Sequence, residues 1–318
     1  MKVSSVCVLG GSGFVGGHLV ASLNNAGKRV RVLTRRRERH KRNLVCPGVE
    51  IVETDVRESS DLARQFEGMD TVIFLAGILN ETHHDHFREV HVEFPRRVVD
   101  AAIKAKVKRI LHMSALNADT AQGVSDYLRS KGEGEDVMHL AAGAGIAVTS
   151  FRPSVIFGSN DSFFNRFANL LRLGPCMPLA CPKVRFAPVY VGDVASAFVK
   201  SLENEATHGE RIELCGPETL TLEELVKHTA EMIGLRRMVL PLSDGLSRTM
   251  ASLLQFAPGK PMTPDNFRSM QLDSVCNCNG LARLGIAPKS IDAIMPMHFQ
   301  RSNETGRFDL YRRSARRS

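Results

Sequence analysis

Short runs of β-branched and other apolar residues alternate with amphipathic stretches through the first half of the chain. The runs with strand character are 6–9, 30–33, 49–52, 71–75, 109–112 and 147–151. Between most of them, apolar residues recur at the spacing of a helix face. These helical stretches are 14–26, 59–67, 87–105 and 125–142. The alternation indicates βαβ units, and therefore an α/β fold with a doubly wound parallel Rossmann sheet over residues 1–158.

The regular alternation ends after Gly158. Helical patterns continue at 162–173, 193–203 and 221–233, with proline-rich connections between them. We expect a smaller, mainly helical substrate region over 159–300, in which 186–206 returns to the Rossmann core. Residues 301–318 are predicted to form a basic tail.

Charge is unevenly distributed along the chain. The 318 residues have a formal net charge of +8. Residues 28–42 contain nine basic residues and one acidic residue, and 301–318 contain six basic and two acidic residues. The remainder is mildly acidic. Without a known recognition motif or interleaved aromatic residues, this distribution argues against a nucleic-acid partner. Any electrostatic contact with a membrane or a protein partner is therefore expected at the basic tail.

The cysteines and the first residues of the sequence bear on the cellular compartment of the protein. Seven cysteines at scattered positions form no Cys-x-x-Cys pair, which favours a reduced chain. A strand-like run begins at Val3 and leaves no room for a secretory signal, and no apolar run approaches the ~20 residues of a membrane helix. We expect a cytoplasmic protein, with peripheral attachment at the inner face of a membrane as an open alternative.

The first strand runs directly into a glycine-rich loop that opens the first helix. The loop fits both GxxGxxG and GxGxxG spacing, with residues Gly10, Gly11, Ser12, Gly13, Phe14, Val15 and Gly16. Glycines permit a tight turn and let backbone N–H groups approach a pyrophosphate, while the helix N-terminus adds partial positive charge. A glycine-rich turn without a ligand has the same composition. The strand–turn–helix context favours a dinucleotide site.

The second strand ends just before Arg35 and Arg36, about 20 residues beyond the loop, where an NAD site usually has an acidic residue. No Asp or Glu occurs from Lys28 to Arg37. Arginine suits a ribose 2′-phosphate because its guanidinium can donate two hydrogen bonds to it. We therefore favour NADP(H), with NAD(H) as the alternative cofactor. A solvated basic loop is the other interpretation of these arginines.

Three residues have the character of an acid/base site. Tyr127 and Lys131 lie four residues apart on one predicted helix and so share a face. A nearby ammonium group is expected to lower the pKa of the phenol. Ser114 follows a predicted strand, at the carboxyl edge where open α/β sheets place their sites. We expect Tyr127 to move a proton and Ser114 to orient a carbonyl. A surface tyrosine beside a solvated lysine is the alternative.

Taken together, these motifs resemble the extended or atypical short-chain dehydrogenases/reductases of the NAD-dependent epimerase/dehydratase-like group. The resemblance extends over about residues 1–300. It rests on the segments Gly10–Gly16, Ser114–Leu116, Tyr127–Glu135, Arg152–Gly158 and Pro188–Ala195. Within that group, the chain is similar to the family of the complex I accessory subunit and its bacterial relatives.

The resemblance implies further cofactor contacts. They would be Asp55 and Val56 at the adenine, Leu75, Ala76 and Gly77 beside the ribose, and Pro153, Val155 and Ile156 along the nicotinamide. Lys131 would also bind the ribose hydroxyls. The sequence departs from the family in two places. His91 stands where we align a structural asparagine, and Met113–Asn117 replaces a segment of sugar-nucleotide epimerases, which argues against a nucleotide-sugar substrate.

The resemblance implies one of two functions. The first is an NAD(P)-dependent oxidoreductase that transfers hydride between the nicotinamide and a carbonyl or alcohol. The second is a non-catalytic NADP(H)-binding accessory or assembly protein, linked to respiratory complex I or to quinone metabolism. The small-molecule substrate is not identified by the sequence, although a quinone-like compound is one candidate. The oligomeric state is also left open.

Three weaker signals remain. His83, His84 and His86 crowd one loop, but adjacent residues rarely converge on one ion, so we expect no metal site and favour a substrate-facing histidine. The apolar stretch 246–262 favours an ordinary core helix over a surface for a quinone, a partner or a bilayer. Cys276-Asn-Cys278 is expected to contain two unrelated thiols.

Overall fold

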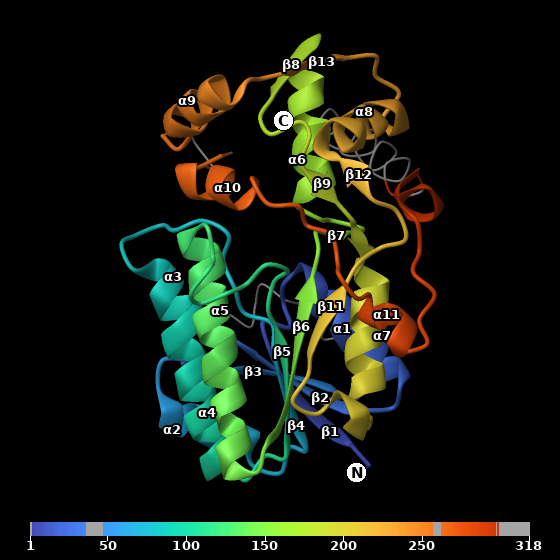
Figure 1. Cartoon of the computed structure of the whole chain (residues 1–318). Helices are drawn as coiled ribbons and strands as arrows, with labels where there is room; N and C mark the ends of the chain where they lie inside the picture. Colours follow the sequence, from blue (N-terminus) through green and yellow to red (C-terminus); the bar gives the residue numbers. More distant parts are fainter. Residues whose placement is uncertain (1, 36–46, 257–261, 297, 299–318) are drawn as a thin grey trace, which may run out of the picture.

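The computed structural model describes residues 2–35, 47–256, 262–296 and 298. Seven parallel strands form its central sheet, in the order β11-β6-β5-β4-β1-β2-β3 (Figure 1). These strands are β1 (Ser5–Leu9), β2 (Arg29–Thr34), β3 (Val49–Glu53), β4 (Thr71–Phe74), β5 (Arg109–Met113), β6 (Ala147–Pro153) and β11 (Arg211–Leu214). The predicted α/β Rossmann class is confirmed, and all six predicted strands are present.

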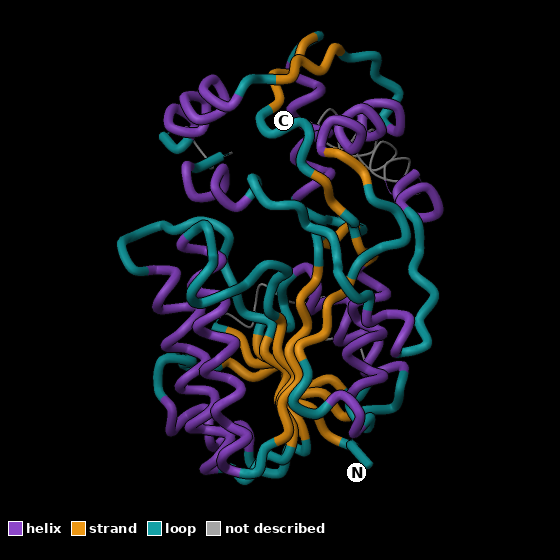
Figure 2. Tube along the Cα trace, viewed as in Figure 1, coloured by secondary structure: helices purple, strands orange, loops and turns teal. Residues whose placement is uncertain are grey.

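Helices cover both faces of this sheet (Figure 2). One face is covered by α1 (Phe14–Asn25) and α7 (Val191–Ser201). The other is covered by α2 (Ser59–Phe66), α4 (Phe94–Lys104) and α5 (Asp126–His139). Side chains alternate along each strand, so in β1 Val6 and Val8 enter the first core, whereas Cys7 and Leu9 enter the second. Burial on both faces explains why the central strands β1 and β4 are almost continuously apolar.

Two short segments precede α4 and bear on the site described below. The chain enters α3 (His86–Arg88) after Asp85, continues as one π-helical turn, η3 (Glu89–Glu93), and then becomes α4. Helix α5 is continued at its C-terminus by a 3-10 turn, η4 (Leu140–Ala144).

The C-terminal part of the chain builds a third, smaller core. Its helices are α6 (Phe163–Leu173), α8 (Leu222–Met232), α9 (Asp244–Leu254), α10 (Pro264–Ser269) and α11 (Gly280–Arg283). Its strands form the pairs β7 (Ile156–Phe157) with β10 (Val189–Tyr190), β8 (Cys176–Leu179) with β13 (Met238–Pro241), and β9 (Arg185–Phe186) with β12 (Leu220–Thr221). The core itself contains Phe157, Phe164 and Leu225.

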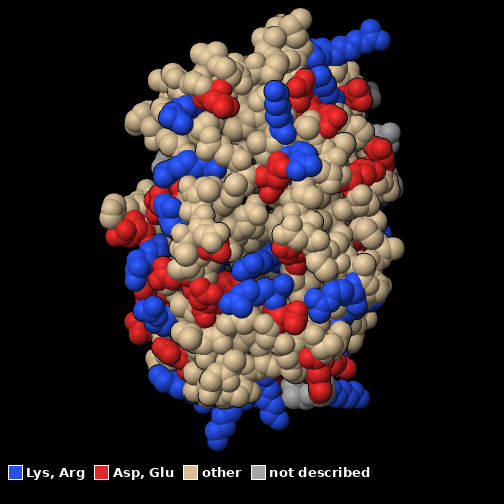
Figure 3. Space-filling model, viewed as in Figure 1, with Lys and Arg blue, Asp and Glu red and all other residues tan. Residues whose placement is uncertain are grey.

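Charged side chains are mixed on the surface. In Figure 3, basic and acidic side chains are interspersed over the face shown.

The expected core helix at α9 is found on one face only. Ala251 is buried in a small core with Met250 and Leu254 packed against it, whereas Leu246 and Leu253 are 59% and 67% exposed.

The expectation of a reduced chain, with an unpaired thiol at Cys276, is wrong. Cys215 and Cys276 form a disulfide, although they lie 61 residues apart in sequence. A scan for closely spaced cysteine pairs cannot detect such a pair.

Among the described residues, no helix has the length and apolar character needed to cross a membrane.

Candidate active site

The glycine loop joins β1 to α1 at the carboxyl edge of the sheet. Gly10 has a φ of +80°, in the left-handed region that favours glycine, and its carbonyl accepts a hydrogen bond from the Gly13 amide at 3.0 Å. A Cβ on Gly16 would lie 2.3 Å from the Gly10 carbonyl oxygen, so this turn closes too tightly for a side chain. Gly13 caps α1 without a side-chain acceptor, and the first turn has no acidic residue. The first N–H groups of α1 are therefore suited to an anion.

The remaining predicted residues of this loop lie in the same turn. Ser12 follows Gly11, while Phe14 and Val15 begin α1. The loop adjoins the end of β4: the Leu75 amide donates to the Leu9 carbonyl, at 2.9 Å. A Cβ on Gly10 would lie 3.0 Å from the Ala76 amide.

The predicted adenine and phosphate contacts lie at the ends of β2 and β3. Asp55 is exposed, and Arg57 donates hydrogen bonds to both of its carboxylate oxygens, at 2.9 and 2.6 Å. Hydrogen bonds from the side chain and backbone of Arg57 lower the pKa of Asp55 to about 2. Val56 packs partly buried against the second core. Arg35 is exposed at the end of β2. Arg36 lies outside the described residues.

Ser114 and Lys131 meet at the carboxyl end of β5. The Lys131 ammonium is buried and donates to the Met113 carbonyl, at 2.7 Å. The next residue, Ser114, is 4% exposed, and its hydroxyl has no hydrogen-bond partner among the described residues. Tyr127 lies one turn before Lys131 on α5. A buried hydroxyl without a partner is energetically costly, which distinguishes Ser114 from an ordinary core serine.

Burial dominates the electrostatics of these groups. It lowers the pKa of Lys131 to about 8, against the opposing effect of the nearby Glu135 carboxylate. It raises the pKa of Tyr127 to about 12. The expectation that Lys131 lowers the pKa of Tyr127 is therefore wrong for this structure, because the cost of taking the phenolate out of water is larger. Tyr127 is a neutral phenol near pH 7, which suits the donation of a proton.

His91 connects the loop after β4 to the helix that bears Tyr127. Its Nε2 accepts a hydrogen bond from the Ile78 amide at 3.1 Å, and its Nδ1 lies 2.9 Å from the Ser130 hydroxyl. Because Nε2 accepts, Nδ1 bears the proton of the neutral ring. Burial and the Lys131 charge hold the pKa of His91 at about 2, consistent with a neutral ring. The Ser130 hydroxyl then donates to the Tyr127 carbonyl, at 2.9 Å.

The π-helical turn that bears His91 packs closely against α5. A Cβ on Gly134 would lie 1.8 Å from the His91 carbonyl oxygen, so the contact requires glycine. A Cβ on Gly77 would lie 3.6 Å from His91 Nε2 and 3.8 Å from Lys131 Nζ. The predicted ribose loop, the histidine and the lysine therefore come together at one point.

The predicted nicotinamide segment leaves β6 beside Ser114. The Pro153 carbonyl accepts from the Leu116 amide at 3.0 Å, and the Val155 carbonyl accepts from the Val189 amide at 2.9 Å. Ile156 then pairs with Val189 in the β7–β10 ladder. These bonds hold the segment at the carboxyl edge of the central sheet.

A C-terminal segment completes the site, and the sequence patterns did not reveal it. We call residues 263–274, which include α10, the strap. The Asp265 carboxylate accepts from the backbone amides of Asp126 and Tyr127, at 2.8 and 3.2 Å. The Ser269 hydroxyl donates to the Ser125 hydroxyl at 2.7 Å. The strap thus caps the helix N-terminus that presents Tyr127, together with the local cap of Ser125 on the Leu128 amide.

The other end of the strap is bound to loops around Ser114. The Asp273 carbonyl accepts from the Asn117 side-chain amide at 2.9 Å, and the Ser274 carbonyl accepts from the Ser154 hydroxyl at 2.6 Å. Thr263 and Asn266 form a capping box, which marks the start of α10 in the sequence. That local signal shows where the helix begins but not which distant helix it caps.

Comparison with known proteins bears on this arrangement. Residues 6–215 match the model of a family described as "NAD dependent epimerase/dehydratase family". The chain belongs to the NAD-dependent epimerase/dehydratase family. The resemblance stated from the sequence motifs is confirmed. The matched region of this family member includes the glycine loop, Ser114, Tyr127 and Lys131, whereas the strap lies beyond it.

Individual relatives include two kinds of protein. The mouse mitochondrial NADH dehydrogenase [ubiquinone] 1 alpha subcomplex subunit 9 is 29% identical over 294 residues, which cover 90% of this chain and 77% of that protein. A ceramide reductase of Caulobacter vibrioides is 28% identical over 264 residues, covering 82% and 81%. Among solved structures, MoeE5 in complex with UDP-glucose and NAD has a TM-score of 0.75 at 18% identity, covering 95% of this chain and 99% of that one. This last similarity shows a shared fold.

Proposed function

We propose that this family member is an NAD(P)-dependent oxidoreductase that reduces a carbonyl group on a small molecule. The observation that carries the proposal is the buried Ser114 hydroxyl, which has no hydrogen-bond partner in the part of the chain that the structure describes. It lies beside Lys131, at the same sheet edge as the glycine loop. Residues 1–158 would hold the dinucleotide, and 159–300 would enclose the substrate. The name of the Caulobacter relative, a reductase, supports the direction of reaction.

The residues present fit a bound dinucleotide. The glycine turn and the N-terminus of α1 would hold the pyrophosphate, because they offer backbone N–H groups without a competing carboxylate. The adenine would lie at Asp55 and Val56, the ribose at Leu75–Gly77, and the nicotinamide along Pro153–Ile156. Lys131 would donate to the ribose hydroxyls. The bound dinucleotide supplies the hydride.

The protein groups would divide the remaining work. Ser114 donates a hydrogen bond to the carbonyl oxygen of the substrate and so fixes its orientation. Tyr127, a neutral phenol with a pKa of about 12, donates its proton to that oxygen as it becomes an alcohol. His91 and Ser130 act on the backbone of Tyr127 and keep this side chain in place.

We also propose NADP(H) as the preferred cofactor, with Arg35 and Arg36 at the 2′-phosphate. The support is the position of these basic residues after β2, where no acidic side chain from the same segment competes for the phosphate. Changing both to alanine is expected to weaken NADPH binding and leave NADH binding nearly unchanged, as measured by quenching of the reduced nicotinamide fluorescence. Equal affinity of the unaltered protein for the two cofactors would contradict this preference.

Changing Tyr127 to Phe tests the catalytic assignment. We expect turnover to fall by about 10²- to 10⁴-fold, the usual effect of removing a general acid, with NADPH affinity unchanged. The measurement is NADPH oxidation with a panel of aldehydes, ketones and quinones. Tyr190→Phe is the matched control, because Tyr190 is the other tyrosine of the described chain and lies outside the proposed site. Undiminished turnover in Tyr127→Phe would overturn the assignment.

A second function, an accessory protein of a respiratory or quinone-linked assembly, is favoured by a different observation. Leu246 and Leu253 leave an apolar outer side on α9, and several relatives are subunits of complex I. Peripheral attachment to a membrane would use the same surface. The two functions differ in outcome: tight NADPH binding with no oxidation by any carbonyl compound or quinone would favour the accessory protein.

A further inference from the structure

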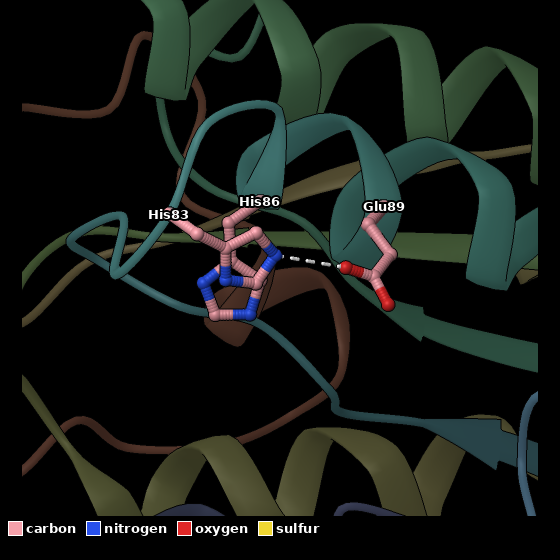
Figure 4. Close-up of side chains that lie close together, drawn as sticks. All are labelled: His83, His86 and Glu89. Atoms are coloured by element: carbon pink, nitrogen blue, oxygen red, sulfur yellow. Dashed lines mark hydrogen bonds and ion pairs between the residues drawn. The ribbon is translucent and has the colours of Figure 1, made fainter.

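The loop between β4 and α3 brings three potential metal ligands together. One ligand atom each of His83, His86 and Glu89 lies within 4.8 Å of the others (Figure 4). The sequence led us to expect no metal site, because neighbouring loop residues rarely converge. Convergence arises here because Asp85 adopts a left-handed conformation, with a φ of 60°, and turns the chain back on itself. The imidazole rings of His83 and His86 consequently stack, with centroids 4.2 Å apart.

Thr82 orients both rings. Its hydroxyl oxygen lies 3.2 Å from Nδ1 of His83 and 3.0 Å from Nδ1 of His86, so one side chain holds the same edge of the two imidazoles. The Nε2 edges then face Glu89, and His83 Nε2 is 3.1 Å from a Glu89 carboxylate oxygen (Figure 4). Histidine ligands of metals are usually fixed in this way, through a hydrogen bond at the ring nitrogen that does not bind the ion. The Thr82 amide also lies 3.4 Å from His86 Nδ1, a contact that ion binding would give up.

We propose that His83, His86 and Glu89 bind one divalent transition-metal ion, with zinc as the best match. Two imidazole nitrogens and a carboxylate oxygen suit zinc and its neighbours, whereas magnesium and calcium prefer oxygen ligands throughout. Three protein ligands leave a coordination position for water or a small molecule. His83 and Glu89 are both more than half exposed, so the ion exchanges with solution rather than forming part of the folding core.

The site adjoins the proposed catalytic residues through Phe87. This ring follows His86 directly, stacks on His91 with centroids 5.5 Å apart, and meets Tyr127 edge-on at 5.9 Å. An ion that fixes His86 therefore fixes the ring next to the phenol and places positive charge at the edge of the site. The binding itself does not depend on the proposed reaction, so failure of either proposal is visible without the other.

Zinc titration of the chelator-stripped, tag-free protein tests the proposal by calorimetry. We expect one zinc ion per chain, and loss of that binding in His83→Ala and in Glu89→Gln. Thr82→Val keeps the shape of the side chain but removes the hydroxyl, and it is expected to weaken zinc binding by about 10- to 100-fold. Cobalt in place of zinc gives a visible absorption band, which reports the coordination geometry.

His84→Ala is the matched control. His84 lies in the same loop, is almost fully exposed and pairs with Asp85 rather than with the cluster. Zinc affinity that is unchanged in His84→Ala and lost in His83→Ala supports the site. Equal loss in the two variants would show non-specific binding by a histidine-rich loop, and would overturn the proposal, as would the absence of stoichiometric zinc binding by the unaltered protein. Circular dichroism of each variant shows that it is folded.

Discussion

The two sides of the candidate site are held by different kinds of interaction. On the sheet side, Gly134 packs against a backbone carbonyl, and Glu135 is fully buried between Arg152 and Arg211. On the strap side, Asp265 and its neighbours use polar contacts that are partly open to water. Substitutions that add bulk on the sheet side are therefore expected to destabilise the fold. Substitutions in the strap are expected to cost less stability, so the strap allows the position of Tyr127 to be tested separately from folding.

The largest effect is expected from Gly134→Ala. The added methyl would overlap the His91 carbonyl oxygen and force α5 away from the π-helical turn. We expect the free energy of unfolding to fall by about 3 kcal/mol or more. Urea denaturation measures it. Gly143→Ala is the matched control, since a Cβ there meets open space and the change is expected to remain within about 0.5 kcal/mol. Similar stability of both variants would contradict the close packing.

A smaller effect on stability, but a clear one on turnover, is expected from Asp265→Ala. Two backbone amides at the start of α5 lose their acceptor, which costs about 0.5–2 kcal/mol. Because Tyr127 bears one of these amides, we expect kcat to fall by roughly 10- to 100-fold with cofactor affinity retained.

Asp292→Ala provides the comparison for this strap variant, because it removes an exposed carboxylate that pairs with His228 in the same C-terminal region. If Asp265→Ala lowers kcat no more than Asp292→Ala does, the strap does not position the phenol.

The smallest effect expected is a shift in pH dependence. Lys131 is protonated below its pKa of about 8 and loses its charge above it, so NADPH affinity is expected to decline as the pH rises through about 8. Glu135 raises that pKa, and Glu135→Gln is therefore expected to move the decline to lower pH. Lys131→Arg, which stays charged, is expected to remove the decline. The measurement is NADPH affinity between pH 6 and about 10 in each protein. An unchanged profile in Lys131→Arg would exclude Lys131 as its source.

Sequence patterns predicted what depends on neighbours along the chain. The βαβ alternation located six strands, and the spacing of Tyr127 and Lys131 placed them one helical turn apart. Strand β11 was missed because it has only four residues, two of them charged. The packing of one face of α9 agrees with the predicted core helix, but the exposure of Leu246 and Leu253 was not predicted, because helical periodicity alone does not show what covers a helix.

Contacts between distant segments could not be predicted in this way. Asp265 caps a helix 138 residues away in sequence, and nothing near Tyr127 indicates its partner. The pKa of Tyr127 depends on how deeply its side chain is buried, and a sequence motif does not specify burial. The convergence of His83 with Glu89 depends on one left-handed residue, Asp85, whose conformation the pattern did not reveal.

The Cys215–Cys276 disulfide closes residues 215–276 into one covalent ring. The ring contains α8, α9, α10 and the whole strap, and it starts at the end of an edge strand of the central sheet. A single peptide-bond cleavage inside the ring would produce two polypeptides that remain linked until the disulfide is reduced. The segment that caps the Tyr127 helix is therefore secured by topology as well as by hydrogen bonds.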